Sequence, residues 1–494
     1  MTDRVNRTLR LVVIPSDPIA AYEAQGIDWL ESYYNPGGMF SEVFAVSPLE
    51  RGRRQACGMT VLGVEERHFA SVLRDLKPDV IRAYGGYWPS DVACLYRPPG
   101  VPVIVSVHDA PPVQPHRSVQ YADMVLCMSN VVARAVAGVG VAQDRIRVLP
   151  NRVDLKRFRP AVENPKAPAS PLPFFPGKNI LHVGRLCRQK NQDTLIRALS
   201  ELPDEYRAIF IGQREKTSCL ALAEKMGVSQ RCSWVDSVRN SELPGWYSRC
   251  DCMCTPSRYE GFGIVFIEAA ACGAGIVTSD IAPMNEYLVD GVSACLVKNH
   301  EDPTALAKAI RKVCEDKSYR ARISEGALAV AGRFDSRVVE EQERRLYEEV
   351  VRMPPRVLPA SSMLTVRLDR AVDRVNVARK RLQSVVSDPK KCIARIRALS
   401  GRCAGRMKRS CRAWGGPGRV YSSFSQYTGG KSHGERVLEW LRKAELSTGG
   451  IRVHSESGEA YPEVSGYLVP TLLNYGETGL AKRMLNWLIC IQRA

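Results

Sequence analysis

The sequence predicts an α/β protein of two doubly wound domains that face a cleft, followed by a helical C-terminal extension. Short apolar runs alternate with helical stretches through the first 150 of the 494 residues, and the alternation starts again near residue 179. A stretch rich in proline and alanine separates the two halves. Strands that alternate with helices favour parallel sheets with both faces covered, because each crossover helix packs against the sheet.

The first half contains five apolar runs of strand length. They are Leu11–Ile14, Val80–Tyr84, Val103–Val107, Met124–Met128 and Ile146–Leu149. Six prolines then crowd into residues 160–176, where neither a helix nor a sheet can continue. We therefore predict an N-terminal Rossmann-like domain over residues 1–160 and a linker over residues 161–178.

The second half repeats the pattern and predicts another Rossmann-like domain over residues 179–350. Its strand candidates are Ile180–Val183, Ala208–Ile211, Cys232–Val235, Cys252–Thr255 and Gly275–Thr278. Its helix candidates are 191–200, 215–226, 263–272, 303–315 and 336–350, and we expect the last of them to pack back across the cleft. Neither half has a G-x-G-x-x-G run after its first strand, which disfavours a dehydrogenase.

Composition and charge separate the folded part from a basic segment. The chain is 45% hydrophobic and 25% charged, as globular domains are, and its net charge is +18. Residues 352–420 hold 18 lysines or arginines and 3 acidic residues, so most of the excess charge lies there. The apolar stretch Leu11–Pro15 is too short for a signal-peptide core, and the sixteen cysteines lack paired spacing. We expect a cytoplasmic protein.

A glycine-rich turn is the sharpest chemical signal. The segment from Pro256 to Gly273 reads PSRYEGFGIVFIEAAACG, a strand end followed by a turn and a helix that starts near Gly263. Such a turn offers unpaired N–H groups and the positive end of a helix dipole to a phosphate. Glu260 precedes the turn and Glu268 lies within the helix. Taken alone, the two glutamates are better explained as a helix-start carboxylate and an unrelated surface residue.

A second loop carries two cations between a strand and a helix. The segment from His182 to Leu199 places Gly184 and Arg185 at a strand end and Lys190 just before the helix. Arginine binds a diphosphate through forked hydrogen bonds and lysine acts as a point charge, so this pair suits a diphosphate. A solvated basic loop is the alternative.

Together these segments resemble the retaining glycosyltransferases of family four, which have the two-domain GT-B architecture. The resemblance covers about residues 8–350. Besides the two loops, it rests on LPNRVD with FRP in residues 149–160, LPGWYSRCD in residues 243–251, the E-x7-E segment, and EYLVDG in residues 286–291. The first strand lacks the paired glycines that many members carry after it. Arg152 and Gly275 stand where glycine and proline are commoner.

The resemblance implies a nucleotide-sugar donor held mainly by the second domain. It assigns Arg185 and Lys190 to the donor diphosphate, Glu268 to the ribose, and Glu260 to the donor sugar. The backbone amides of Phe262 and Gly263 would meet the sugar and the phosphate.

The first domain would then be the acceptor side. There the segment VHD ends a strand at the cleft, and His108 matches a histidine that such enzymes place over the donor sugar. The resemblance also implies transfer with retention of configuration. No D-x-D motif stands where a donor would need a metal, so we expect a metal-independent hexosyltransferase without a cofactor.

The C-terminal part lies beyond the resemblance. We predict a basic, partly amphipathic helical linker over residues 351–425. Within it, residues 364–414 combine an apolar stripe with a surface that includes Arg367 and Arg370, which suits an anionic membrane surface. A helix docked on the protein is the alternative, and nucleic acid is a weaker one. Residues 426–494 resemble the start of an α/α-toroid domain or form a small helical appendage.

We therefore expect a glycosyltransferase that builds a cell-envelope polysaccharide or a related glycoconjugate. Its acceptor would be a glycan or a lipid-linked molecule, with the protein in the cytoplasm or attached peripherally to the inner face of the membrane. Two alternatives remain open at this point. One is a non-hydrolysing nucleotide-sugar epimerase, and the other is a non-enzymatic scaffold that binds a membrane or nucleic acid.

Overall fold

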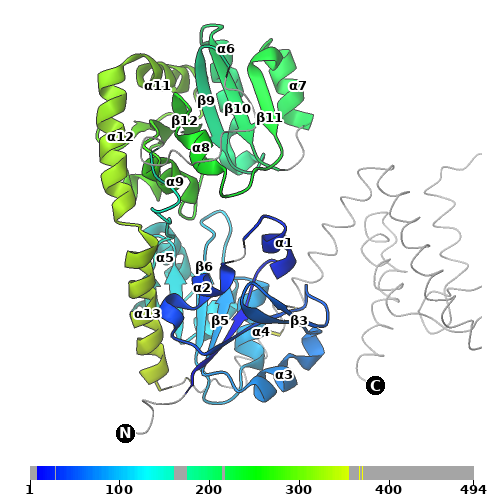
Figure 1. Cartoon of the computed structure of the whole chain (residues 1–494). Helices are drawn as coiled ribbons and strands as arrows, with labels where there is room; N and C mark the ends of the chain where they lie inside the picture. Colours follow the sequence, from blue (N-terminus) through cyan, green and yellow to red (C-terminus); the bar gives the residue numbers. More distant parts are fainter. Residues whose placement is uncertain are drawn as a thin grey trace, which may run out of the picture. The chain divides into compact units, whose positions relative to one another are not determined.

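A computed structural model describes most of the chain up to Arg370 (Figure 1). The described residues are 8–354 without 28, 161–174 and 214–216, together with 356, 366, 367 and 370. They belong to one compact unit that ends at Arg370. Most of the predicted linker, nearly all of the basic segment and the whole toroid-like region lie outside these residues, so those predictions stay predictions.

The first half forms an eight-stranded sheet in the order β3-β4-β2-β1-β5-β6-β7-β8. The strands are β1 Arg10–Ile14, β2 Glu42–Ser47, β3 Arg53–Ala56, β4 Met59–Gly63, β5 Val80–Tyr84, β6 Val103–Val107, β7 Met124–Cys127 and β8 Ile146–Val148. Every neighbouring pair is parallel except β3 and β4. The predicted strands are all present, whereas β2, β3 and β4 were not predicted.

Side chains of the central strands alternate between two apolar cores, one on each face of the sheet. In β1, Val12 and Ile14 join the core on one face, while Leu11 and Val13 join the core on the other. Both faces are therefore buried, which explains why these strands read as continuous apolar runs rather than as alternating ones.

The second half forms a six-stranded parallel sheet in the order β11-β10-β9-β12-β13-β14. Its strands are β9 Lys178–Val183, β10 Tyr206–Ile211, β11 Cys232–Val235, β12 Cys252–Thr255, β13 Ile276–Ser279 and β14 Cys295–Val297. The two sheets confirm the predicted α/β class with two Rossmann-like domains.

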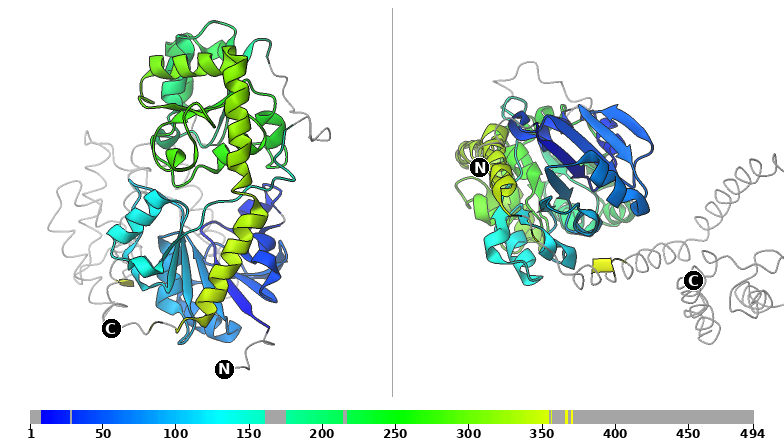
Figure 2. Two further views of the ribbon diagram at one scale, coloured as in Figure 1. Left: turned by 90° about the vertical axis from the view of Figure 1, so that its left-hand side faces the viewer. Right: turned by 90° about the horizontal axis from the view of Figure 1, so that it is seen from below.

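Helices cover the faces of both sheets (Figure 2). They are α1 Ile19–Glu23, α2 Leu30–Tyr34, α3 Phe69–Leu76, α4 Trp88–Tyr96, α5 Asn130–Gly138, α6 Gln192–Ser200, α7 Thr217–Lys225, α8 Leu243–Tyr247, α9 Ile264–Ala271, α10 Met284–Tyr287, α11 Pro303–Glu315, α12 Lys317–Gly332 and α13 Ser336–Arg352. None of the helices in the described ranges is both long enough and apolar enough to cross a membrane.

The last helix, α13, packs on the first sheet although it follows the second sheet in sequence (Figures 1 and 2). Val339, Tyr347 and Val350 belong to the same core as Leu11 of β1. This arrangement agrees with the expectation that the last helix packs back across the cleft. It also means that a second domain over residues 179–350 includes a helix whose core lies with the first domain.

The chain crosses between the halves at two places, and the two crossing segments are hydrogen-bonded to each other. The backbone N–H of Val153 donates to the carbonyl of Phe334 at 2.8 Å. The N–H of Ser336 donates to the carbonyl of Val153 at 2.9 Å. These two bonds join the chain after β8 to the turn between α12 and α13.

Helix α13 also carries a buried carboxylate that joins two arginines of the first half. Glu343 lies 3.0 Å from Arg82 of β5 and 2.6 Å from Arg152, which follows β8. The three side chains are only 2–7% exposed. Charges this deeply buried are tolerated because each has an opposite partner. Arg152 stands where the resembling family more often has glycine, and this ion pair gives the arginine a structural role.

The start of the basic segment contacts the first half of the chain. Val366 is 1% exposed. The guanidinium of Arg370 lies 2.6 Å from Glu66 and 3.2 Å from Asp91. We expected Arg370 on a cationic surface that faces lipid. The structure instead pairs it with two carboxylates of the protein, which matches the alternative of a docked helix at this position.

Candidate functional site

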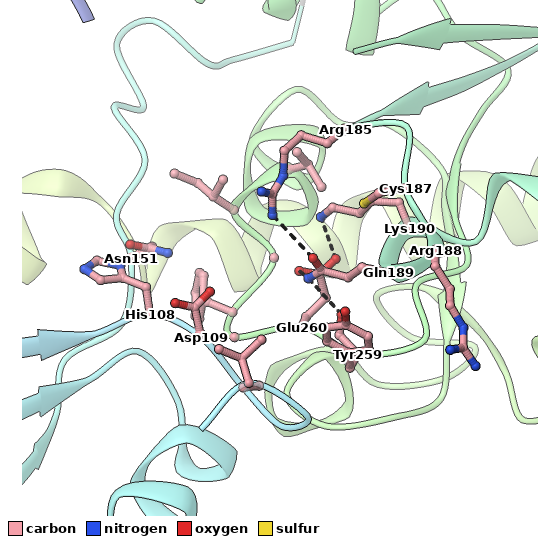
Figure 3. Close-up of a pocket in the computed structure, with 18 residues that line it drawn as sticks. His108, Asp109, Asn151, Arg185, Cys187, Arg188, Gln189, Lys190, Tyr259 and Glu260 are labelled. Atoms are coloured by element: carbon pink, nitrogen blue, oxygen red, sulfur yellow. Dashed lines mark hydrogen bonds and ion pairs between the residues drawn. The ribbon is translucent and has the colours of Figure 1, made fainter. Parts of the chain in front are cut away.

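A cavity of about 720 Å³ lies between the two halves and collects most of the predicted site residues (Figure 3). From the second half it is lined by the loop after β9 and by the turn before α9. From the first half it is lined by the segment after β6 and by Asn151. In α/β folds, ligands bind outside the carboxyl ends of the strands, and this cavity has that position.

The loop after β9 brings three cations to the wall of the second half, namely Arg185, Arg188 and Lys190. Arg185 is exposed and makes one long side-chain hydrogen bond, 3.4 Å to Gln189 (Figure 3). Lys190 is buried, and its ammonium lies 2.6 Å from the carboxylate of Glu260. Thus Arg185 is the more available of the two predicted diphosphate ligands.

Glu260 is held by a small hydrogen-bond network. The hydroxyl of Ser257 donates to its carboxylate at 2.7 Å, and the side-chain amide of Gln189 donates to it at 3.3 Å. With Lys190, three side chains fix a carboxylate that is only 4% exposed. The sequence did not predict Ser257 and Gln189 as site residues, although both lie within the two motif segments that end at Gly273 and Leu199.

The glycine-rich turn needs both of its glycines. A Cβ on Gly261 would come within 1.7 Å of the carbonyl oxygen of His108, so only glycine allows this approach between the two halves. Ser129 also donates a hydrogen bond of 2.6 Å to the carbonyl of Gly261. Gly263 has φ +85° and precedes α9, which has no side-chain cap at its N-terminus. The N–H of Phe266 already donates to the carbonyl of Gly263 at 3.0 Å, so the N–H groups of Ile264 and Val265, which line the cavity, are the ones that remain for a ligand.

His108 lies at the end of β6 on the opposite wall, with Asp109 and Asn151 (Figure 3). Its ring stacks on Tyr84 at 6.1 Å between centroids. Burial, aided by Arg82, lowers the pKa of His108 to about 4, so the imidazole is neutral at pH 7. Its Nε2 atom is buried and has no hydrogen-bond partner in the described part of the protein. A neutral ring with one unused nitrogen can bind a sugar hydroxyl.

Asp109 lines the cavity, and the sequence predicted no role for it. Burial raises the pKa of its carboxyl group, and Arg185 across the cavity partly offsets the effect. Among the described residues, its carboxylate has no hydrogen bond or ion pair. The signal for it was its place directly after His108 at the end of a strand.

Glu268 differs from the other predicted residues because it does not line this cavity. Its side chain is buried in the body of the second half, where the hydroxyl of Tyr247 donates to it at 3.1 Å. Burial raises the pKa of Glu268 to about 7, although hydrogen bonds from Tyr247 and Asn240 act in the opposite direction. Its assignment to the ribose stays a prediction.

This raised pKa predicts a pH-dependent stability. Between about pH 4.5 and pH 7 the folded protein keeps the Glu268 proton while the unfolded chain releases it, so stability should fall as pH rises through this window. As pH rises, the free energy of unfolding of the wild type should fall by up to about 1.4 kcal/mol per pH unit more than that of Glu268→Gln. Urea unfolding of both proteins across the window measures this. Parallel curves would contradict it, and the exposed Glu325→Gln serves as the control.

Seven of the eight predicted site residues meet at the cavity. They are His108, Gly184, Arg185, Lys190, Glu260, Phe262 and Gly263. Within the described part of the chain, no group of three or more His, Cys, Asp or Glu side chains is placed to hold a metal ion.

Two family models match the chain, one in each half. The model described as "Glycosyltransferase Family 4" matches residues 55–157, and the model described as "Glycosyl transferases group 1" matches residues 170–329. The matched ranges contain the cavity residues of the first and the second half, respectively.

Characterised relatives align with part of the chain. A D-inositol 3-phosphate glycosyltransferase from Xylanimonas cellulosilytica is 34% identical over 205 residues, which cover 40% of this chain and 49% of the relative. A D-inositol 3-phosphate glycosyltransferase from Catenulispora acidiphila is 28% identical over 312 residues. The match covers 55% of this chain and 74% of the relative. The chain thus spans about half the length of the first of these relatives.

Solved structures share the fold at low sequence identity. Sucrose-phosphate synthase from Thermosynechococcus elongatus has a TM-score of 0.56 and 17% identity, and the match covers 69% of this chain and 98% of that one. The Anabaena protein HepE in complex with UDP and glucose has a TM-score of 0.56 and 18% identity. The match covers 69% of this chain and 100% of HepE.

Proposed function

The chain belongs with the family-four glycosyltransferases of GT-B fold, and on this premise we propose that it transfers a sugar from a nucleotide-sugar donor to an acceptor hydroxyl. One observation carries the proposal. The cavity joins a cationic loop, a buried glutamate and a glycine turn before an uncapped helix on one wall, and a neutral histidine on the other.

The donor's diphosphate would bind between the loop after β9 and the N-terminus of α9. Arg185 and Arg188 are exposed on this wall, and Lys190 lies behind them. The charge that develops on the leaving diphosphate would be met by Arg185, Lys190 and the helix dipole. Prearranged charges of this kind lower the barrier because they need no reorganisation during the reaction.

The transferred sugar would lie between Glu260 and His108. Glu260 is held rigidly by three side chains, which suits a carboxylate that accepts hydrogen bonds from sugar hydroxyls. His108 lies on the opposite wall, and its Nε2 atom, which is buried in this structure, would reach a sugar hydroxyl after a rotation of the ring. Contacts from two walls would then orient the anomeric carbon toward the acceptor.

The finer features of the reaction are also proposals. We propose transfer of a hexose with retention of configuration and without a metal, since the cations of the loop after β9 can meet the diphosphate charge. We propose a glycan acceptor of the cell envelope, reached from the cytoplasm. A peripheral membrane contact through residues 364–414, apart from Val366 and Arg370, which contact the protein, is a further proposal. The domain limits at residues 160, 178, 350 and 425 are proposals as well.

Donor binding tests the proposal directly. A specific nucleotide sugar should raise the melting temperature of the full chain, because a ligand that binds only the folded state stabilises it by RT ln(1 + [L]/Kd). UDP-, GDP-, ADP- and dTDP-linked sugars form the panel, with the free nucleotides and inorganic diphosphate as controls. Release of nucleoside diphosphate in the presence of an acceptor then measures transfer. If no nucleotide sugar shifts the melting temperature, the proposal fails.

A further inference from the structure

The wall of the cavity that belongs to the first half has a distinct charge. The described residues on it are His108, Asp109, Ala110, Val113 and Asn151. They include one carboxylate and no arginine or lysine, and the histidine is neutral at pH 7. The cations of the cavity, among the described residues, all belong to the opposite wall.

Hydroxyls and a second carboxylate continue this wall beyond the cavity. Strands β1, β5 and β6 are parallel neighbours, so the segments that follow them meet at one edge of the sheet. Ser16 and Asp17 follow β1 and Tyr87 follows β5. The hydroxyl of Ser16 donates to Asp17 at 3.2 Å, and Tyr87 lies close to both residues. Tyr87 in turn lies close enough to Asp109 to interact with it electrostatically.

Arginines of the first half that approach this edge already have partners. Arg54 pairs with Glu23 of α1 at 2.7 Å and with Glu50 at 3.3 Å. Arg82 and Arg152 are buried beneath His108, where they share Glu343. The described part of this edge therefore presents mainly hydroxyls and carboxylates, and Arg185 on the opposite wall offsets the charge of Asp109 only in part.

We propose that this edge is an acceptor site for a hydroxyl-rich sugar or polyol without a phosphate group, oriented by Asp109. The inference rests on the proposed function, since it names the acceptor class of the same cavity. It differs from what the relatives' names state, because they are named for D-inositol 3-phosphate. A phosphate on the acceptor would face Asp109 and Asp17, whereas hydroxyls donate to carboxylates in strong, charge-assisted hydrogen bonds.

In the transfer step Asp109 positions the acceptor and stays deprotonated. The acceptor oxygen forms a bond to the anomeric carbon of the donor sugar while the bond from that carbon to the diphosphate oxygen breaks. The electron pair of the broken bond goes to the diphosphate, which also takes the proton of the acceptor hydroxyl. Asp109 is a positioning residue that accepts a hydrogen bond from a neighbouring acceptor hydroxyl.

Matched acceptor pairs test this inference on the full chain, with a donor already shown to bind. The pairs are inositol and inositol 3-phosphate, glucose and glucose 6-phosphate, and N-acetylglucosamine and its 6-phosphate. Within a productive pair, kcat/KM for the unphosphorylated member should be at least about tenfold higher. Asp109→Asn should raise the KM for the unphosphorylated acceptor and lower the ratio of its kcat/KM to that of the phosphorylated acceptor. The donor should raise the melting temperature of this variant as much as it raises that of the wild type. Asp75→Asn, an exposed change on α3, should leave the ratio unchanged.

Three outcomes would overturn the inference. The first is a kcat/KM for the phosphorylated member that equals or exceeds that of the unphosphorylated member. The second is a ratio of the two kcat/KM values that stays unchanged in Asp109→Asn. If neither member of any pair is glycosylated, saturation-transfer NMR in the presence of the nucleoside diphosphate of the donor that binds measures acceptor binding instead. The third outcome is then no binding of any unphosphorylated member. A chain that binds no nucleotide sugar at all would instead count against the proposed function, so the two failures are distinguishable.

Discussion

Replacing Glu343 by glutamine is expected to lower the free energy of unfolding by about 3–5 kcal/mol. The substitution keeps the size of the side chain and removes its charge. Arg82 and Arg152 would then remain buried with their shared carboxylate gone, and an uncompensated buried charge is strongly destabilising. Urea unfolding at pH 7, followed by circular dichroism, gives the difference from the wild type.

The matched control is Glu341→Gln on the same helix. Glu341 pairs with Arg344 and Arg345 at the surface, so its removal should change the unfolding midpoint little. A further variant replaces Arg82, Arg152 and Glu343 together by apolar residues of similar size, and it should recover much of the loss. Equal midpoints for Glu343→Gln and Glu341→Gln would show that the buried ion pairs do not stabilise the fold.

Replacing Arg185 or Lys190 by alanine is expected to reduce kcat/KM by roughly 30- to 10³-fold, or about 2–4 kcal/mol of transition-state stabilisation. Each variant removes one of the cations proposed to meet the leaving diphosphate. Arg185→Ala is the cleaner experiment because its guanidinium is exposed. Lys190→Ala also strips the buried Glu260 of its ion pair, so its melting temperature must be measured beside its kinetics.

Arg197→Ala is the control for both variants. Arg197 is an exposed arginine of α6 outside the cavity, so its loss tests for a general effect of reduced charge. It should leave kcat/KM within about twofold of the wild type, since it makes no contact in the transition state. Full activity of a protein that lacks both Arg185 and Lys190 would rule out their assignment to the diphosphate.

The sequence predicted the central strands well because both of their faces are buried. Such strands read as uninterrupted apolar runs, and the ends of the predicted strands fall within two residues of those observed. Strand β3, Arg53–Ala56, was missed because it lies at the edge of the sheet and its residues are mostly polar. Strand β2, Glu42–Ser47, is largely apolar, so its sequence did contain a usable signal.

The site was predictable where it is local in sequence and not where it depends on distant segments. The loop after β9 and the glycine turn are contiguous motifs, and both line the cavity. The pairing of Lys190 with Glu260 joins residues 70 positions apart, and that of Arg152 with Glu343 joins residues 191 apart. Glu268 does not line the cavity, and the hydroxyl of Tyr247 donates to it, so its assignment to the ribose stays a prediction.

The paired crossing segments connect the two halves by two stretches of chain rather than one. Val153 is hydrogen-bonded on both sides, to Phe334 and to Ser336, so the two crossings cannot slide past each other without breaking these bonds. A single flexible tether would let the halves tumble freely, whereas a double tether restricts them mainly to bending and twisting about one point. The two walls of the cavity would then move apart over a short distance and return to the same relative position. If the proposed donor and acceptor sites lie on these walls, they could part to release products and return to the same alignment.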